Sequence, residues 1–128
     1  MHAEIAERLF AGLLDAKLGA FAATLDTESA WELPGRSALA GFHRGPEAIL
    51  AVVELLATPR PIRPDAYDIA ASDFHAVLMT RLVGDGLDSD HAFVVVADDE
   101  SGRLARAFHY VFDLYAFDAH FAPHVRGQ

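Results

Sequence analysis

The sequence contains no cysteine, only one tryptophan and no long apolar run. Without cysteine, neither a disulfide framework nor a thiolate metal site can form. Such a chain suits a reducing compartment, and we expect it in the cytoplasm. No window approaches the roughly 20 apolar residues that cross a bilayer. The first segment, Met1 to Leu14, is interrupted by Glu4, Glu7 and Arg8, which is untypical of a signal peptide. We therefore expect no membrane partner.

Basic residues are also scarce. Ten Lys and Arg stand against 19 Asp and Glu, which gives a net charge of −9 at pH 7, and the arginines form no run. A chain of this charge repels phosphate backbones, so we expect no nucleic-acid partner. The 128 residues are 52% hydrophobic, which is enough to bury a core without metals or disulfides. Because no internal repeat or linker divides the chain, we predict one domain over residues 1–128.

Helical periodicity dominates the first half of the chain. Ile5, Leu9 and Leu13 recur every four residues, which predicts a helix from Ala3 to Leu14. A second helix is predicted from Leu18 to Leu25 on the same kind of spacing. Pro-Gly and Gly-Pro pairs mark the ends of the elements that follow. These are a short strand at Ser29–Leu33, a long loop at Arg36–Arg44 and a third helix from Glu47 to Leu56.

The second half of the chain is typical of sheet. Pro59, Pro61 and Pro64 exclude regular helix, and the strand-like runs that follow are separated by short turns. Consecutive strands joined by short turns predict an antiparallel meander. Helices that precede strands, without alternating with them, indicate the α+β class. The predicted strands are Tyr67–Phe74, His75–Val83, His91–Ala97 and Arg103–Phe112, and a last short helix is predicted at Leu114–Phe121.

Two segments resemble a known superfamily. In WELPGRSALAGFHRGPEAILAVVELL, Trp31 to Leu56, an aromatic strand leads through a Pro-Gly turn and a Gly-aromatic-x-x-Gly element to the third helix. In SGRLARAFHYVFDLYAFDAHF, Ser101 to Phe121, a strand after a Gly-basic turn reaches an aspartate before an aromatic helix. Together with the order of the elements, these two segments resemble sequences of the SnoaL-like branch of the nuclear transport factor 2-like superfamily. The resemblance implies a cone: a curved antiparallel sheet, three helices and a short C-terminal helix around an apolar pocket.

The resemblance also implies a range of activities, because the superfamily includes steroid isomerases, epoxide hydrolases, polyketide cyclases, dehydratases and non-catalytic binding or scaffold proteins. The steroid isomerase mechanism needs a tyrosine on the first helix, whereas the first tyrosine here is Tyr67. Arg81 and Asp73, with Asp90 or Asp113, do not reproduce the spacing of the epoxide hydrolase site. We expect a cofactor-independent lyase, cyclase or isomerase acting on a small apolar or carbonyl-bearing metabolite. The alternative is a non-catalytic ligand-binding or dimeric scaffold protein.

His109 and Asp113 are the candidate catalytic residues. Strand alternation places them on one face of Arg103–Phe112, and Arg106 and Tyr110 on the other. If the first face is concave, His109 is a general base whose proton affinity Asp113 tunes. If the second is concave, Tyr110 and Arg106 donate to a developing enolate. In a third alternative, Asp113 caps the final helix and His109 has a structural role.

Further candidates lie near the expected mouth of the pocket. Trp31, Arg36 and His43 are candidate substrate-binding residues, and so is Tyr110 if its face is concave. Trp31 is also suited to packing in the core. His120 and His124 have the four-residue spacing of a helical metal site, but Pro123 lies between them, so we expect no metal and no cofactor.

Two predicted strands are apolar on both faces, His91–Ala97 and the end of the next strand at Phe108–Phe112. A sheet that exposed one face to water would alternate apolar and polar residues. One face should therefore meet the helices and the other a second subunit. We predict a two-fold homodimer through the outer face of the sheet.

Overall fold

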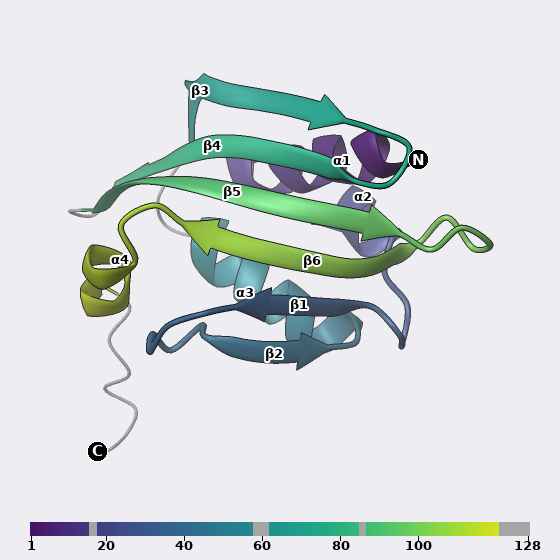
Figure 1. Cartoon of the computed structure of the whole chain (residues 1–128). Coiled ribbons are helices and arrows are strands. Elements are labelled where there is room, and N and C mark those ends of the chain that lie inside the picture. Colours follow the sequence, from purple (N-terminus) through teal and green to yellow (C-terminus); the bar gives the residue numbers. More distant parts are fainter. Residues whose placement is uncertain (16–17, 58–61, 85–86, 121–128) are drawn as a thin grey trace.

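The computed structural model describes residues 1–15, 18–57, 62–84 and 87–120. In this part of the chain, helices cover one face of an open six-stranded sheet with the strand order β2-β1-β6-β5-β4-β3 (Figure 1). The predicted α+β class is thereby confirmed. The helices are α1 (His2–Asp15), α2 (Gly19–Ala22), α3 (Pro46–Ala57) and α4 (Leu114–His120); the strands are β1 (Ala30–Leu33), β2 (Gly41–Arg44), β3 (Ile62–Ala71), β4 (Ala76–Gly84), β5 (Leu87–Ala97) and β6 (Leu104–Val111).

The predicted meander is present in strands β3 to β6, each of which pairs antiparallel with the next. β3 begins earlier than predicted and includes Pro64, which an edge strand tolerates because one side of its backbone has no partner in the sheet. One strand pair departs from the antiparallel sheet that the resemblance implied. β1 pairs parallel with β6, with Trp31 opposite Ala107, so the sheet is mixed.

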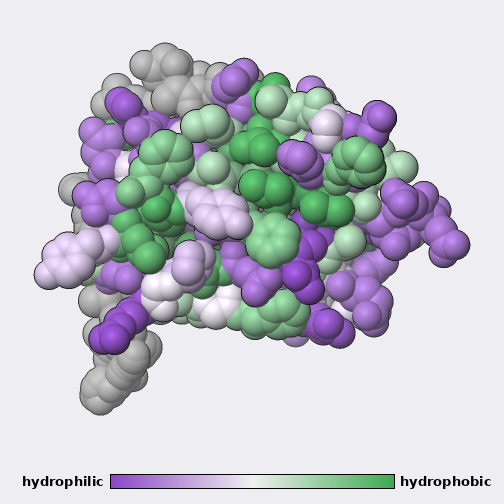
Figure 2. Space-filling view, in the orientation of Figure 1, coloured by the Kyte–Doolittle hydropathy of each residue, from purple (hydrophilic) through white to green (hydrophobic). Residues whose placement is uncertain are grey.

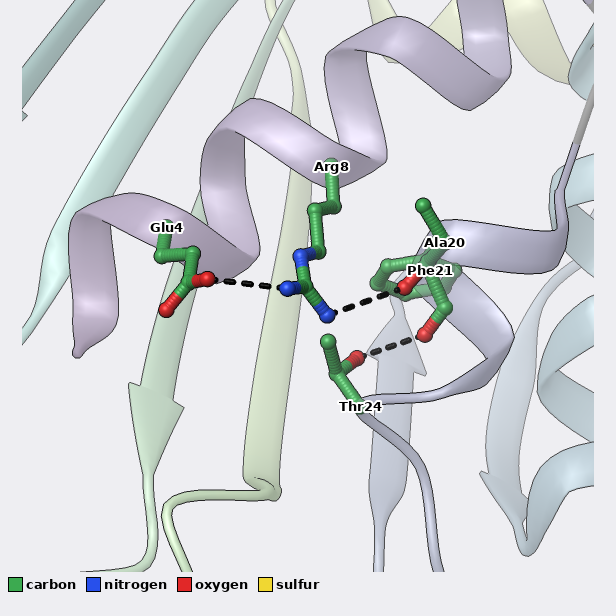
Figure 3. A network of polar contacts seen from close by, with 5 residues as sticks. All are labelled: Glu4, Arg8, Ala20, Phe21 and Thr24. Atoms are coloured by element: carbon green, nitrogen blue, oxygen red, sulfur yellow. Dashed lines mark hydrogen bonds and ion pairs between the residues drawn. The ribbon is translucent and has the colours of Figure 1, made fainter.

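Two elements of the first half differ from the prediction. Within the predicted long loop, Gly41–Arg44 forms β2, which pairs antiparallel with β1. The predicted second helix is reduced to the four residues of α2. There the Thr24 hydroxyl donates to the Phe21 carbonyl at 2.6 Å, a local bond that competes with continuation of the helix. Arg8 of α1 donates to Glu4 at 2.9 Å and to the Ala20 carbonyl at 3.4 Å, and so ties α1 to this turn (Figure 3).

The core lies between the helices and the inner face of the sheet. On β4 the described even-numbered residues are buried and on β5 the odd-numbered ones are, as expected for strands with one face against helices, and on β6 the buried residues are Leu104, Ala107 and His109. Ile5, Leu9 and Leu13 of α1 are buried against them, as the periodicity predicted. Among the described helices, none is long and apolar enough to span a membrane.

Candidate functional site

His109 lies on the inner face of β6 and is completely buried. Ala107 shares that face and is also buried, whereas Tyr110 on the opposite face is 50% exposed. Of the two faces that the sequence left open, the one that carries His109 therefore turns toward the helices. The outer face carries Tyr110 and Arg106.

A second histidine, His91, stands beside His109 on the inner face of the sheet. β5 and β6 pair in a register that sets Phe93 opposite His109, and His91 is two residues before Phe93 on the same face. The Nδ1 atom of His91 is 2.7 Å from Nε2 of His109. On its other side, Nε2 of His91 is 2.5 Å from the Ser89 hydroxyl. Ser89, His91 and His109 thus form a continuous hydrogen-bonded chain, the histidine chain, in the interior.

Aromatic rings enclose the histidine chain. The centroid of the His109 ring is 4.3 Å from that of Phe93 and 5.7 Å from that of Trp31. Phe117, which comes from α4, lies edge-on to both imidazoles, with centroids 6.0 Å from His109 and 5.3 Å from His91. Trp31, Phe93 and Phe117 are all fully buried. The resemblance implied a pocket with an open mouth, whereas the interior beside His109 is closed by these rings.

Two ring nitrogens in this cluster have no hydrogen-bond partner among the described residues. They are Nδ1 of His109 and Nε1 of Trp31, and the Thr80 hydroxyl nearby in the sheet is also without one. More than nine in ten buried polar groups are paired in native proteins. The buried His2 follows that rule, with Nδ1 accepting from the Ala97 N–H at 3.0 Å and Nε2 3.0 Å from the Asp73 carbonyl oxygen. The ring nitrogens of His109 and Trp31 depart from that rule.

Burial keeps both imidazoles of the histidine chain neutral. Loss of hydration lowers the pKa of His91 from 6.5 to about 4, and the neighbouring Asp90 carboxylate opposes this lowering. Burial also lowers the pKa of His109 well below 6.5, and the charge that His91 would carry lowers it further. A neutral imidazole has one nitrogen with a hydrogen and one with a lone pair. His109 can therefore present either a donor or an acceptor at Nδ1.

Helix α4 holds Phe117 over the histidine chain, and Asp118 fixes this helix in place. The Asp118 carboxylate accepts hydrogen bonds from the backbone N–H groups of Arg36 and Ser37, at 3.0 and 3.2 Å. Gly35 has a φ of 105°, and a β-carbon there would lie 2.6 Å from Asp118 Oδ1. Only glycine accommodates both this backbone angle and the approach of α4. Helix α4, which covers the site, thus packs against the Pro-Gly turn after β1.

Replacing Asp118 with Ala is expected to release α4. Two hydrogen bonds to a charged carboxylate are lost. The population of molecules in which α4 has detached from the Pro-Gly turn should therefore rise roughly tenfold. Trp31 is the only tryptophan of the chain, so acrylamide quenching of its fluorescence reports the opening directly. Asp99→Ala, a change in an exposed turn, is the matched control and should quench like the wild type. Equal quenching of Asp118→Ala and the wild type would contradict the role of this contact.

The other candidate residues lie apart from the histidine chain. Asp113 is exposed in the turn before α4, where its carbonyl accepts from the Phe117 N–H at 3.1 Å. One ring nitrogen of His109 faces His91 and the other has no partner, so Asp113 does not hydrogen-bond to His109. The imidazole of His43 lies 2.8 Å from the Leu39 carbonyl oxygen and holds the loop before β2. Arg36 is exposed beside a surface hollow of about 340 Å³ that Tyr115 also lines.

Tyr110 and Arg81 belong to the outer surface. Tyr110 lines a hollow of about 390 Å³ together with Glu32 and Phe42 of the outer face, and His109 is also among the residues that border this hollow. Arg81 forms ion pairs with Asp90 at 3.0 Å and with Asp88 at 3.6 Å, also on the outer face. Arg81 and Asp90, which were compared with the epoxide hydrolase site, therefore lie on the outer face and not in the interior.

His91, Ser89 and Phe117 are site residues that sequence reasoning missed. The sequence did contain a signal for Ser89 and His91. In the alternation of the strand, these two polar residues share a face with the apolar residues Phe93 and Val95, which indicates that they are buried. Among the described residues, no group of three His, Asp or Glu side chains could hold a metal ion. Of the pair with helical metal-site spacing, His124 and the side chain of His120 lie outside the described residues.

No protein-family model matches the sequence, and no curated protein matches it at a significant level. Solved structures do match. The protein Bal32a from a soil-derived mobile gene cassette is 24% identical, with a TM-score of 0.75 over 94% of this chain and 95% of that one. A nuclear transport factor 2-like protein from Burkholderia xenovorans is 18% identical, with a TM-score of 0.70 over 91% and 94% of the two chains.

A third similar structure is that of a proposed SnoaL-like polyketide cyclase from Shewanella denitrificans. It is 10% identical, with a TM-score of 0.66 over 91% of this chain and 94% of that one. At these identities, similarity establishes the fold and leaves the activity open. The chain therefore has the nuclear transport factor 2-like fold.

Proposed function

We propose that this chain is a small-molecule enzyme whose site is the interior beside His109. It acts as a cofactor-independent lyase, cyclase or isomerase on a small apolar or carbonyl-bearing metabolite, and His109 is the acid-base residue. The observation that carries this proposal is the Nδ1 atom of His109, which is fully buried and has no partner among the described residues. An unpaired polar atom among apolar rings is costly for stability and valuable for binding.

The surroundings of His109 suit this role. Trp31, Phe93 and Phe117 offer flat apolar surfaces, which favour a planar or cyclic ligand once Phe117 moves aside. An imidazole that is neutral at pH 7 can take a proton on its free nitrogen, and its N–H can donate a hydrogen bond to a substrate oxygen. Asp113 serves in this account to begin α4, and His109 carries the acid-base chemistry alone.

Exchange of carbon-bound hydrogen tests the proposal without knowledge of the natural substrate. The protein is incubated in D₂O with a panel of small ketones, such as cyclohexanone, 1-tetralone and acetophenone, and loss of the proton signal next to each carbonyl is followed by NMR. An acid-base site for carbonyl compounds should accelerate exchange of at least one panel member over the buffer rate. His109→Phe keeps an aromatic ring of similar shape and removes both nitrogens, so it should abolish the acceleration.

Asp113→Asn is the control, and it should retain the wild-type exchange rate because Asp113 is exposed and does not hydrogen-bond to His109. The alternative function is a non-catalytic ligand-binding or scaffold protein. It is favoured by the closed interior, in which His109 has no exposed surface. A ketone that binds at His109 and exchanges at the buffer rate would support this alternative against the enzyme.

We also propose that two copies of the chain associate through the outer face of the sheet. Figure 2, drawn in the orientation of Figure 1, shows apolar side chains gathered over the middle of this face. Met79 is 42% exposed there, although it is a large apolar residue. An apolar patch over the centre of a sheet is typical of protein interfaces. The residues that supply it include Val77, Met79, Ala92, Val94, Val96 and Phe108.

A further inference from the structure

The histidine chain leaves one question open, namely which nitrogen of His109 carries the hydrogen. We propose that Ser89 and His91 are positioning residues that hold His109 as the tautomer with its hydrogen on Nδ1. In this state His109 and Trp31 present two buried N–H donors, and the ligand class that fits them is a neutral carbonyl compound. The inference rests on the proposed function, since it assigns the ligand of the same site.

The tautomer follows from counting hydrogens along the chain. Ser89 has a single hydroxyl hydrogen, and its oxygen has one partner among the described residues, Nε2 of His91. If Ser89 donates, His91 carries its hydrogen on Nδ1 and donates to Nε2 of His109. The hydrogen of His109 must then be on Nδ1. Both hydrogen bonds of the histidine chain are then made. Among its side-chain donors, only the Nδ1–H of His109, which faces the interior, has no acceptor.

The opposite direction satisfies fewer groups. If His91 donates from Nε2 to the Ser89 oxygen, the serine hydrogen has no acceptor among the described residues, although Ser89 is only 5% exposed. A buried hydroxyl without an acceptor is unfavourable enough to shift a two-state equilibrium by about tenfold or more. The tautomer with hydrogen on Nδ1 of His109 is therefore the dominant one in the ligand-free protein.

The donor character of the site selects the ligand. The indole nitrogen of Trp31 can only donate, and it is unpaired like Nδ1 of His109. The two rings are in edge contact, with centroids 5.7 Å apart. A ligand that completes them must bring an acceptor oxygen. A carboxylate would be buried beside two neutral histidines, and no ion pair of the described residues brings a cation there to balance it, so a ketone, aldehyde or ester fits better. In this tautomer the Nδ1–H of His109 donates to the carbonyl oxygen and polarises it, which is the acid half of the proposed acid-base role, and the hydrogen that leaves the neighbouring carbon passes to solvent water.

The tautomer can be read without any ligand. In protein labelled with ¹⁵N-histidine at pH 7, the Nδ1 signal of His109 should be of the protonated, pyrrole type and the Nε2 signal of the pyridine type. Ser89→Ala removes the hydrogen that sets the direction, and the tautomer ratio should fall by about tenfold. Ser89→Thr keeps a hydroxyl and should keep the wild-type ratio. A wild-type signal with hydrogen on Nε2, or an unchanged ratio in Ser89→Ala, would overturn the inference.

Three probes of similar size test the ligand class: acetophenone, its hydrocarbon analogue 2-phenylpropene, and benzoate. The single tryptophan gives one indole N–H signal, which should move downfield with acetophenone and less with the other two. An equal response to ketone and hydrocarbon, a preference for benzoate, or no response to millimolar acetophenone would count against the two donors. Failure of the proposed function gives a different result. In that case His109→Phe leaves hydrogen exchange unchanged, while the ¹⁵N spectrum of the wild type still shows the hydrogen on Nδ1 of His109.

Discussion

Acidification from pH 7 to pH 4.5 is expected to lower the free energy of unfolding by about 2 to 3 kcal/mol through His91 alone, and His109 adds to this loss. The folded protein holds both imidazoles neutral, whereas the unfolded chain binds protons on them below pH 6.5. Acid therefore draws the equilibrium toward the unfolded state. For His91 the loss begins near pH 6.5 and levels off below about pH 4, once the folded protein also takes up the proton.

Urea unfolding at pH 7, 6, 5 and 4.5 measures this slope. The double variant His91→Phe, His109→Phe removes both titrating groups and leaves the Ser89 hydroxyl without its partner, so its stability at pH 7 should fall by about 1 to 3 kcal/mol while its slope with pH becomes nearly flat. His75→Gln, at an exposed position, is the matched control and should keep the wild-type slope. If the double variant loses stability with acid as steeply as the wild type, the histidine chain is not the source of the acid sensitivity.

The second large effect concerns the outer face of the sheet. A light-scattering measurement at micromolar concentration should give the wild type a mass of twice 13.9 kDa, and Val94→Arg should give 13.9 kDa. Val94 lies on β5 opposite Val77 on one side and Phe108 on the other, so it occupies the middle of the apolar patch. A buried, unpaired arginine in each of two contacting copies would abolish the interface.

Two controls keep this result interpretable. Glu54→Arg introduces an arginine at an exposed position of α3, on the helical side of the sheet, and should remain dimeric. Circular dichroism should show that Val94→Arg retains the wild-type fold, since its side chain lies outside the core. A wild-type protein that is monomeric at micromolar concentration would refute the homodimer.

The sequence predicts those parts of the fold that depend on local patterns. The spacing of Ile49, Val52, Val53 and Leu56 determines α3, and those residues are buried as expected. The grouping of His109 with Ala107 was also predicted, because alternation along one strand needs no knowledge of its neighbours. Alternation alone could not decide which group faces inward, since the face of His109 carries small apolar residues and the opposite face carries Phe108 and Tyr110, and either set can pack against helices.

The remainder depends on contacts between distant segments. β2 has only four residues, and its pairing with β1 is not visible in a loop rich in glycine. His91 was read as part of an apolar strand, and only the register of β5 on β6 places it beside His109. Phe117 reaches the site because Asp118 seats α4 on the Pro-Gly turn, a contact between residues more than eighty positions apart. No pattern within either segment indicates such a contact.

The hydrogen exchange of a small ketone in D₂O, compared between the wild type and His109→Phe, tests the central claim most directly. General acid-base catalysis by one side chain typically contributes a factor of about 100 or more. We predict that the wild type accelerates exchange of at least one ketone of the panel, that His109→Phe returns it to the buffer rate, and that Asp113→Asn leaves it unchanged. Equal rates for the wild type and His109→Phe would contradict the assignment of His109 as the acid-base residue.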